Sequence, residues 1–238
     1  KIPVASIGTL GIKFKGKTIK TNLTTPDTVF LHQTLQKIKK ENIDNVIIEA
    51  SSHGLDQKRL DHINFKAGIF TNLSQDHLDY HKTMRSYFNA KLILLNNILS
   101  KKKIVITDKS INQFSEIKKV SKKNQLKLID ISKIENKLKR KSKLNFNFIQ
   151  LKNISMAIAA AKICNISEKK IFKSLKKIID VNGRLELVKI FSKNIKVYVD
   201  FAHTPEALLK SLQVLRKNQN DNISLVFGCG GDRDYKKR

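Results

Sequence analysis

Short apolar runs of strand length alternate along this chain with longer segments in which apolar residues recur every three or four positions. Such alternation is typical of an α/β fold, in which helices flank a central parallel sheet. We expect strands at residues 4–7, 46–49, 67–71, 104–107 and 126–129. We expect helices at residues 28–40, 85–99, 111–123, 154–164 and 168–178. Thr25, just before Pro26, is expected to cap the first of these helices.

Residues 132–148 interrupt this pattern, because they are rich in lysine and asparagine and show only weak periodicity. We interpret them as irregular structure or short strands. A second pattern begins near residue 181, with strands expected at residues 185–191, 196–200 and 223–227 and a helix at residues 205–217. We therefore expect one domain at residues 1–180 and the start of a second, doubly wound Rossmann-like domain at residues 181–238.

Both ends of the chain look cut, which leads us to expect a fragment. The first residue is not Met, and the last residues follow a strand and a glycine turn with no closing element. No apolar run approaches the roughly 18 residues of a membrane span, and no signal peptide opens the chain. The two cysteines, Cys164 and Cys229, form no CxxC pair, which fits a reducing cytoplasm.

The formal net charge of +27 raises the possibility of nucleic-acid binding. However, the lysines are spread along all 238 residues, and aromatic side chains do not interleave with them as a base-stacking surface requires. We favour a solvated lysine-rich surface, whose charge would still help to capture an anionic substrate.

Polar side chains follow two of the predicted strands, at the edge of a parallel sheet where ligands bind. Glu49 ends one strand, and His77 lies in the polar segment after the next. A carboxylate with few other protein ligands suits Mg²⁺, which completes its shell with water and phosphate oxygens. A capped turn with a locally bonded histidine is the alternative, and zinc at His77 and His81 is disfavoured because no Glu follows the first His.

Two further positions could carry chemistry. Lys91 lies among apolar residues of a predicted helix, where snorkelling is the simpler interpretation and a buried amine open to chemical modification is the other. Asp200 ends a predicted strand between the glycine-containing segments at residues 183–184 and 228–233. Glycines allow close backbone approach to a ligand, but the chain has no GxxxxGK[ST] phosphate loop, so we expect no self-sufficient nucleotide site.

Several longer strings occur in a fixed order. They are Thr24-Thr25-Pro26, Glu49-Ala50-Ser51-Ser52-His53-Gly54-Leu55, the run from Phe70 to His81, Ala90-Lys91, Asn182-Gly183-Arg184-Leu185-Glu186, Asp200-Phe201-Ala202-His203-Thr204-Pro205 and the run from Phe227 to Asp234. In these strings the chain resembles the Mur ligases, specifically the UDP-N-acetylmuramoyl-tripeptide synthetase (MurE) type. The resemblance implies a Mur ligase central domain followed by the start of the C-terminal ligase domain.

The resemblance also implies a reaction. ATP would phosphorylate the carboxylate of UDP-MurNAc-L-Ala-D-Glu, and the amine of a diamino acid, meso-diaminopimelate or L-lysine, would displace the phosphate. Glu49 and His77 would hold Mg²⁺, and Lys91 would be carbamylated to bind a second Mg²⁺. The residues expected to contact the UDP-MurNAc-dipeptide are Thr24, Thr25, Ser51, Gln57 and Arg59. Asn153, Arg184 and Asp200 would bind the adenosine part of ATP, and Arg233 would approach the carboxylate of the incoming amino acid.

The family's ATP loop and uracil-binding domain are missing before Ile7, and the match around Asn153 is loose. We therefore expect the isolated chain to be inactive, and ligation by it would overturn that expectation. Three other interpretations remain open: a folylpolyglutamate synthetase-like ligase, a basic nucleic-acid-binding module and a non-catalytic remnant. The strings around Ser51 and His77 favour the tripeptide synthetase. The family motif that selects diaminopimelate or lysine would lie beyond Arg238.

Overall fold

The protein is described by a computed structural model that covers residues 2–141, 146–218 and 222–228. The strands are β1 (Val4–Gly8), β2 (Gly11–Phe14), β3 (Lys17–Ile19), β4 (Asn45–Ile48), β5 (Ala67–Ile69), β6 (Ile104–Thr107), β7 (Lys127–Asp130), β8 (Glu186–Ile190) and β9 (Lys196–Val199). The α-helices are α1 (Thr28–Lys40), α2 (Ser52–Asp56), α3 (Leu78–His81), α4 (Met84–Ile93), α5 (Phe114–Lys123), α6 (Ser132–Lys141), α7 (Phe148–Ile163), α8 (Glu168–Leu175) and α9 (Pro205–Asn218). A π-helical turn, η1 (Leu94–Ile98), extends α4, and a 3₁₀ turn, η2 (Ser192–Asn194), joins β8 to β9.

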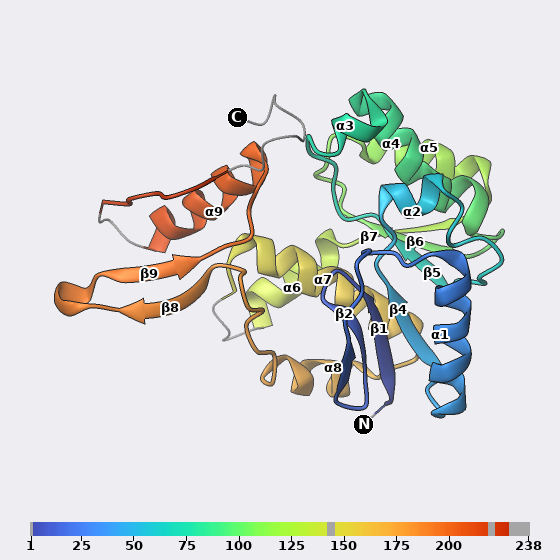
Figure 1. The fold of residues 1–238 in the computed structure, drawn as a ribbon, viewed down its shortest axis with the longest axis horizontal. Coiled ribbons are helices and arrows are strands. Elements are labelled where there is room, and N and C mark those ends of the chain that lie inside the picture. Colours follow the sequence, from blue (N-terminus) through green and yellow to red (C-terminus); the bar gives the residue numbers. More distant parts are fainter. Residues whose placement is uncertain (1, 142–145, 219–221, 229–238) are drawn as a thin grey trace. The chain divides into compact units, whose positions relative to one another are not determined.

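The N-terminal sheet has the order β3-β2-β1-β4. β2, β1 and β4 lie side by side in this order in Figure 1. β1 pairs antiparallel with β2 and parallel with β4, with Ile7 opposite Ile48. The backbone N–H of Glu49 continues this pairing by donating to the carbonyl of Ile7 at 2.8 Å. The residues that leave the carboxyl ends of β1 and β4 therefore meet at one edge of the sheet.

A second sheet has the order β5-β6-β7. It is parallel and flanked by helices, so the predicted fold class is confirmed. All five strands predicted before residue 180 form, each within two residues of the expected bounds. The hairpin partners β2 and β3 were not predicted, because they are only four and three residues long and carry little periodic signal.

Thr25 does not cap α1, so that prediction is wrong. The cap is Asp27, whose side chain accepts a hydrogen bond from the backbone N–H of Phe30 at 3.0 Å. A short carboxylate at the residue before the helix satisfies an N–H that has no partner inside the helix. Thr25 is instead fully buried, and its hydroxyl has another role described below.

The interpretation of residues 132–148 as irregular structure or short strands is also wrong, because α6 occupies most of this segment. Its apolar face is narrow, but Leu138 is fully buried and Ile134 packs against the same apolar cluster, and these contacts fix a helix that is otherwise mostly charged. α7 starts six residues before the predicted helix. Asn147 and Gln150 form a reciprocal capping box there, with distances of 2.9 and 3.0 Å.

The chain forms two compact units. Unit 1 comprises residues 1–68, 83–105 and 116–127, and unit 2 comprises residues 69–82, 106–115 and 128–238. In unit 2, β8 and β9 pair antiparallel as a hairpin that leads to α9 (Figure 1). The strand predicted at residues 223–227 is wrong, because residues 222–228 form no strand in the structure.

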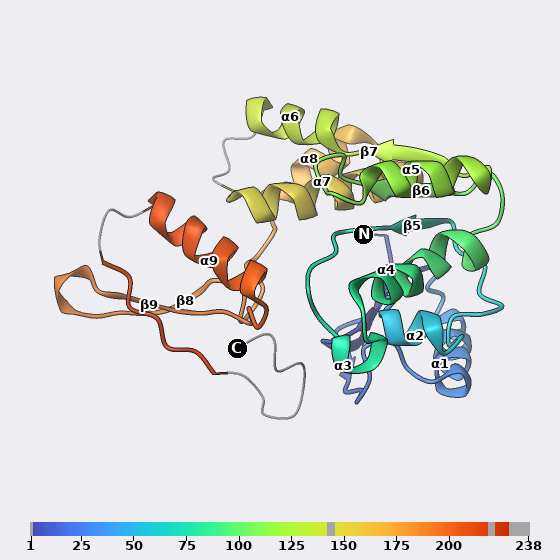
Figure 2. The same ribbon diagram turned by 90° about the horizontal axis from the view of Figure 1, so that it is seen from above.

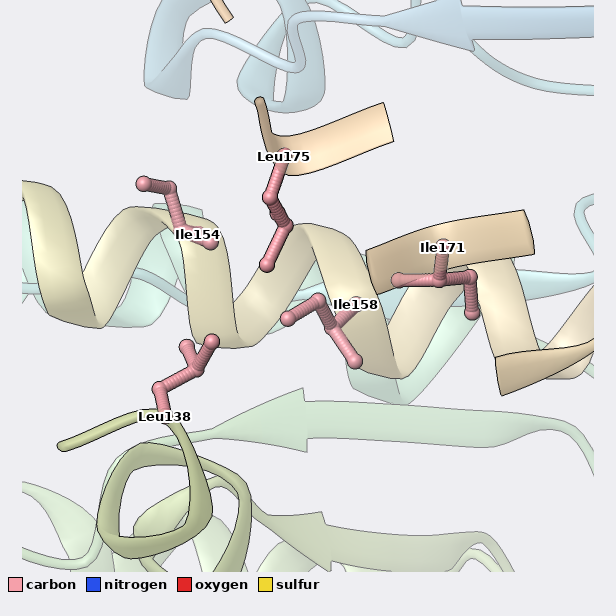
Figure 3. Packing of buried hydrophobic residues seen from close by; sticks show 5 residues of the cluster. All are labelled: Leu138, Ile154, Ile158, Ile171 and Leu175. Atoms are coloured by element: carbon pink, nitrogen blue, oxygen red, sulfur yellow. The ribbon is translucent and has the colours of Figure 1, made fainter. Parts of the chain in front are cut away.

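An apolar cluster in unit 2 joins α6, α7 and α8, which lie beside one another in Figure 2. Its buried members are Leu138 from α6, Ile154 and Ile158 from α7, and Ile171 and Leu175 from α8 (Figure 3). The two buried residues of α7 are four positions apart, as are the two of α8, so each of these two helices turns one apolar stripe inward. This cluster fixes α7, whose first turns carry Asn153.

Candidate active site

In unit 1, the buried hydroxyl of Thr25 organises the turn between β4 and α2. It donates to the carbonyl of Glu49 at 2.7 Å, lies 3.0 Å from the hydroxyl of Ser51, and accepts from the backbone N–H of Ser51 at 2.9 Å. Ser51 in turn caps α2 by accepting from the N–H of Gly54 at 3.0 Å. A Cβ at Gly54 would lie 2.7 Å from the Thr25 side chain, so this approach requires glycine.

The carboxylate of Glu49 is held at the same edge of the sheet. One of its oxygens, Oε2, accepts from the backbone N–H of Thr9 at 2.8 Å and from the Thr9 hydroxyl at 3.0 Å. The same hydroxyl lies 3.0 Å from that of Thr24. Glu49 is therefore an exposed carboxylate in a fixed orientation.

Arg59 ties the remaining predicted substrate residues to this turn. Its guanidinium donates to the carbonyl of Thr25 at 2.8 Å and to the side-chain oxygen of Gln57. The residues predicted from the resemblance to contact the UDP-MurNAc-dipeptide thus lie in one hydrogen-bonded network with Glu49: Thr24, Thr25, Ser51, Gln57 and Arg59.

Lys91 lies on α4 of unit 1, which packs beside α2 in this unit (Figure 2). The side chain is half-buried, and its Nζ lies 5.2 Å from the centre of the Tyr87 ring. A cation over an aromatic face is a favourable contact for an unmodified lysine. Carbamylation of Lys91 stays a prediction.

In unit 2, His77 precedes α3 with a left-handed backbone (φ 55°), an unfavourable conformation for a non-glycine residue. Its N–H donates to the carboxylate of Asp76 at 2.8 Å. The other oxygen of that carboxylate lies 3.3 Å from Nε2 of His203, whose Nδ1 lies 3.0 Å from the carbonyl of Phe201. Our sequence analysis missed Asp76 and His203 as site residues, although both lie inside the strings that carry the resemblance.

Asn153, Arg184 and Asp200 line one cavity of about 550 Å³ in unit 2. The three residues come from α7, from the segment before β8 and from the end of β9. The cavity thus brings together the three residues predicted to bind adenosine. Its volume is within the range of small-molecule sites in proteins.

Asp200 also orders the cavity wall. Its carboxylate accepts from the backbone N–H groups of Leu185 and Ala202, at 2.7 and 2.8 Å, and from the hydroxyl of Ser211 at 3.1 Å. Arg184 lies next to this arrangement, with its guanidinium carbon 4.8 Å from the centre of the Phe201 ring. A guanidinium on an aromatic face presents a flat, charged surface to a ligand.

An ion pair between the half-exposed Lys152 and the buried Asp108, which the sequence did not reveal, fixes α7 to the end of β6. Asp108 is almost fully buried, and Nζ of Lys152 lies 2.5 Å from its carboxylate and 2.7 Å from the Ser110 hydroxyl. Burial raises the pKa of Asp108. The hydrogen bonds from Lys152 and Ser110 together lower this pKa by more than burial raises it, so the net pKa is below the ordinary value. Lys152 precedes Asn153, so this pair holds the cavity residue in place.

The pKa of Asp108 predicts a pH dependence of stability. Because its folded-state pKa is lowered, the pair stabilises the fold above the unfolded-state pKa of about 3.9 and loses this effect as pH falls through the folded-state pKa. Lys152→Met should cost about 1–2 kcal/mol at pH 7, because it leaves a buried carboxylate without its cation. In urea unfolding the difference from wild type should shrink below pH 4. A difference in the free energy of unfolding that stays constant from pH 7 to pH 3 would contradict this role. The control is Lys39→Met, because Lys39 forms an exposed pair with Asp44.

Arg233 lies outside the described residues, so its predicted contact with the amino acid stays a prediction. Within residues 2–141, 146–218 and 222–228, no three His, Cys, Asp or Glu side chains gather as a metal site would require. In the same ranges, none of the helices combines the length and apolar character needed to cross a membrane.

Comparison with known families gives two matches along the chain. The Mur ligase middle domain matches residues 2–166, and the Mur ligase glutamate ligase domain matches residues 183–238. The chain belongs to the Mur ligase family. The predicted resemblance is therefore confirmed at the level of the family.

Curated relatives of this Mur ligase chain agree with that assignment. A UDP-N-acetylmuramoyl-L-alanyl-D-glutamate–2,6-diaminopimelate ligase from Brucella melitensis is 35% identical over 264 residues, which cover 99% of the chain and 53% of the relative. A solved structure of a ligase with the same name matches with a TM-score of 0.69 and 25% identity, over 99% of the chain and 52% of the solved chain. The chain thus spans about half the length of the curated relatives it matches.

A folylpolyglutamate synthase from Mycobacterium tuberculosis matches with a TM-score of 0.63 but only 14% identity, over 90% of the chain and 60% of that protein. Agreement at this identity concerns the fold alone.

Proposed function

We propose that this Mur ligase chain is part of an ATP-dependent ligase that joins a diamino acid to UDP-MurNAc-L-Ala-D-Glu through an acyl phosphate, in peptidoglycan synthesis. The observation that carries the proposal is the network in which Thr24, Thr25, Ser51, Gln57 and Arg59 surround the backbone and carboxylate of Glu49. The names of the relatives favour 2,6-diaminopimelate over lysine as the amino acid. The first family match ends at residue 166 and the second begins at residue 183, so the domain boundary that we propose near residue 180 lies between the two matches.

Mg²⁺ is part of this proposal, and the residues fit it. Glu49 presents an oriented, exposed carboxylate, which is the hard oxygen ligand that Mg²⁺ takes, and few other protein ligands are needed. His77 and a carbamylated Lys91 would be the other protein ligands. When bound, Mg²⁺ would neutralise the charge that phosphoryl and carboxylate groups bring together.

Within the chain, each group of residues has its own task. The Thr25 network positions the carboxylate substrate, and an oriented substrate removes much of the entropic cost of reaching the transition state. The cavity of unit 2 would hold the adenosine of ATP. Arg184 would form the cationic part of its wall and Phe201 the aromatic part. We place the reaction in the cytoplasm, where ATP is available and cysteines stay reduced.

The direct test is ligation by the protein as its gene encodes it. With UDP-MurNAc-L-Ala-D-Glu, 2,6-diaminopimelate, ATP and Mg²⁺, we expect one phosphate released for each tripeptide formed, detected by mass spectrometry. The same assay with L-lysine tests the amino-acid choice. Elongation of a folate in place of the muramoyl dipeptide would contradict the proposal in favour of the folylpolyglutamate reading. Steeply salt-dependent DNA binding that survives Glu49→Gln would favour the nucleic-acid reading.

The adenosine site gives a second prediction. Arg184→Ala should raise the dissociation constant for an ATP analogue about tenfold, because it removes the cation and uncovers Phe201. Isothermal titration calorimetry measures this change. Arg140→Ala is the matched control, since Arg140 is exposed on α6 and does not line the cavity. Equal affinities of the two variants would remove Arg184 from the site.

A further inference from the structure

No family string in our sequence analysis included Gly8, the last residue of β1, or Thr9, which follows it. Thr9 uses both its N–H and its hydroxyl on one atom, Oε2 of Glu49, at 2.8 and 3.0 Å. The register of β1 against β4 pairs Ile7 with Ile48, and it therefore places the residues that follow Ile7 next to Glu49. The register of the sheet thus brings the two residues close, and the side-chain conformations of Glu49 and Thr9 complete the two hydrogen bonds.

Gly8 makes this approach possible. A Cβ at Gly8 would lie 2.5 Å from Oε2 of Glu49, closer than real Cβ contacts allow, and 3.0 Å from the Cβ of Glu49, which is a tight contact. The carboxylate therefore folds back over the backbone of Gly8 while Thr9 holds it from the side. Any larger residue at position 8 would push the carboxylate away from Thr9.

The Thr9 hydroxyl also lies next to a residue of the proposed dipeptide-binding network. It lies 3.0 Å from the hydroxyl of Thr24, which belongs to the proposed dipeptide-binding network. One hydroxyl thus stands between a proposed metal ligand and a proposed substrate contact. Residues that orient metal ligands in this way change metal affinity about 10–100-fold when they are mutated.

We propose that Thr9 is a positioning residue that couples the Glu49 carboxylate to Thr24, with Gly8 providing the space. Metal binding and dipeptide binding then depend on the same hydroxyl. This inference rests on the proposed function, because the roles of Glu49 and Thr24 come from it.

The test compares Thr9→Val with Thr9→Ser in the protein as its gene encodes it. Valine keeps the shape and the backbone N–H but removes the hydroxyl, whereas serine keeps the hydroxyl. We expect Thr9→Val to weaken the binding of Mn²⁺, followed by its EPR signal in the presence of an ATP analogue, about tenfold. We also expect it to weaken the binding of UDP-MurNAc-L-Ala-D-Glu in calorimetry, and Thr9→Ser to restore both affinities to within about twofold of wild type.

Two further variants sharpen the result. Gly8→Ala should weaken Mn²⁺ binding while the Thr9 hydroxyl is still present. Thr18→Val, at an exposed threonine of β3 in the same unit, should change neither affinity. Wild-type affinities in Thr9→Val, or a Thr9→Ser variant as weak as Thr9→Val, would overturn the inference. A wild-type protein that binds neither probe would instead refute the proposed function.

Discussion

Lys91→Ala is expected to lower the rate of ligation at least about a hundredfold, which makes it one of the two largest effects that we predict. In our proposal the carbamate on Lys91 supplies an anionic oxygen to Mg²⁺, and losing such electrostatic stabilisation typically costs a factor of 100–1,000 in rate. Short-chain carboxylic acids, such as acetate or propionate, should restore part of the activity by placing a carboxylate where the carbamate was. The measurement is phosphate release with and without the added acid.

Lys118→Ala is the matched control, because Lys118 is an exposed lysine on α5 in the same unit. It should keep full activity and show no response to the added acids. A Lys91→Ala variant that stays active, or one that no acid rescues, would count against the carbamate. In that case the contact between Lys91 and the Tyr87 ring would be its main role.

The second large effect concerns stability. Ile158 is 2% exposed and packs in the cluster where α6, α7 and α8 meet (Figure 3). Ile158→Ala should lower the free energy of unfolding by about 2–5 kcal/mol, through lost burial and through the cavity that remains. Urea unfolding followed by circular dichroism measures the change.

The control for this prediction is Ile195→Ala, since Ile195 is 57% exposed near the end of the β8–β9 hairpin. Its cost should stay within about 0.5 kcal/mol. If both variants lost the same stability, the cluster could not be the core that fixes α7. The cavity residue Asn153 would then owe its position to the Asp108–Lys152 pair instead.

Much of the fold was predictable because periodicity is local. α1, β6, β8 and β9 follow directly from the pattern of apolar residues. α6 was missed because its apolar stripe consists only of Ile134 and Leu138 among charged and polar residues, which leaves periodicity little to detect. The start of α7 was missed although Asn147 and Gln150 carry a capping-box signal, because the apolar residues between them suggested a strand just as well.

The candidate site, like the fold, has residues that the sequence predicted and residues that it did not. Family strings predicted which residues take part, and the structure brings five of them together around Glu49. Thr9 escaped sequence analysis because its partner Glu49 is 40 residues away, and only the pairing of β1 with β4 joins them. Asp76 and His203 escaped for the same reason. A single sequence carries no signal for contacts between distant residues.

The hydrogen bond between Asp76 and His203 joins positions 127 residues apart. A ribosome adds about 5–20 residues per second, so the segment that carries His77 is made roughly 6–25 seconds before its partner histidine exists. During that time the strained backbone of His77 lacks one of the contacts that hold it. The loop before α3 is thus synthesised well before His203 and completes its native contacts only after that residue has been added.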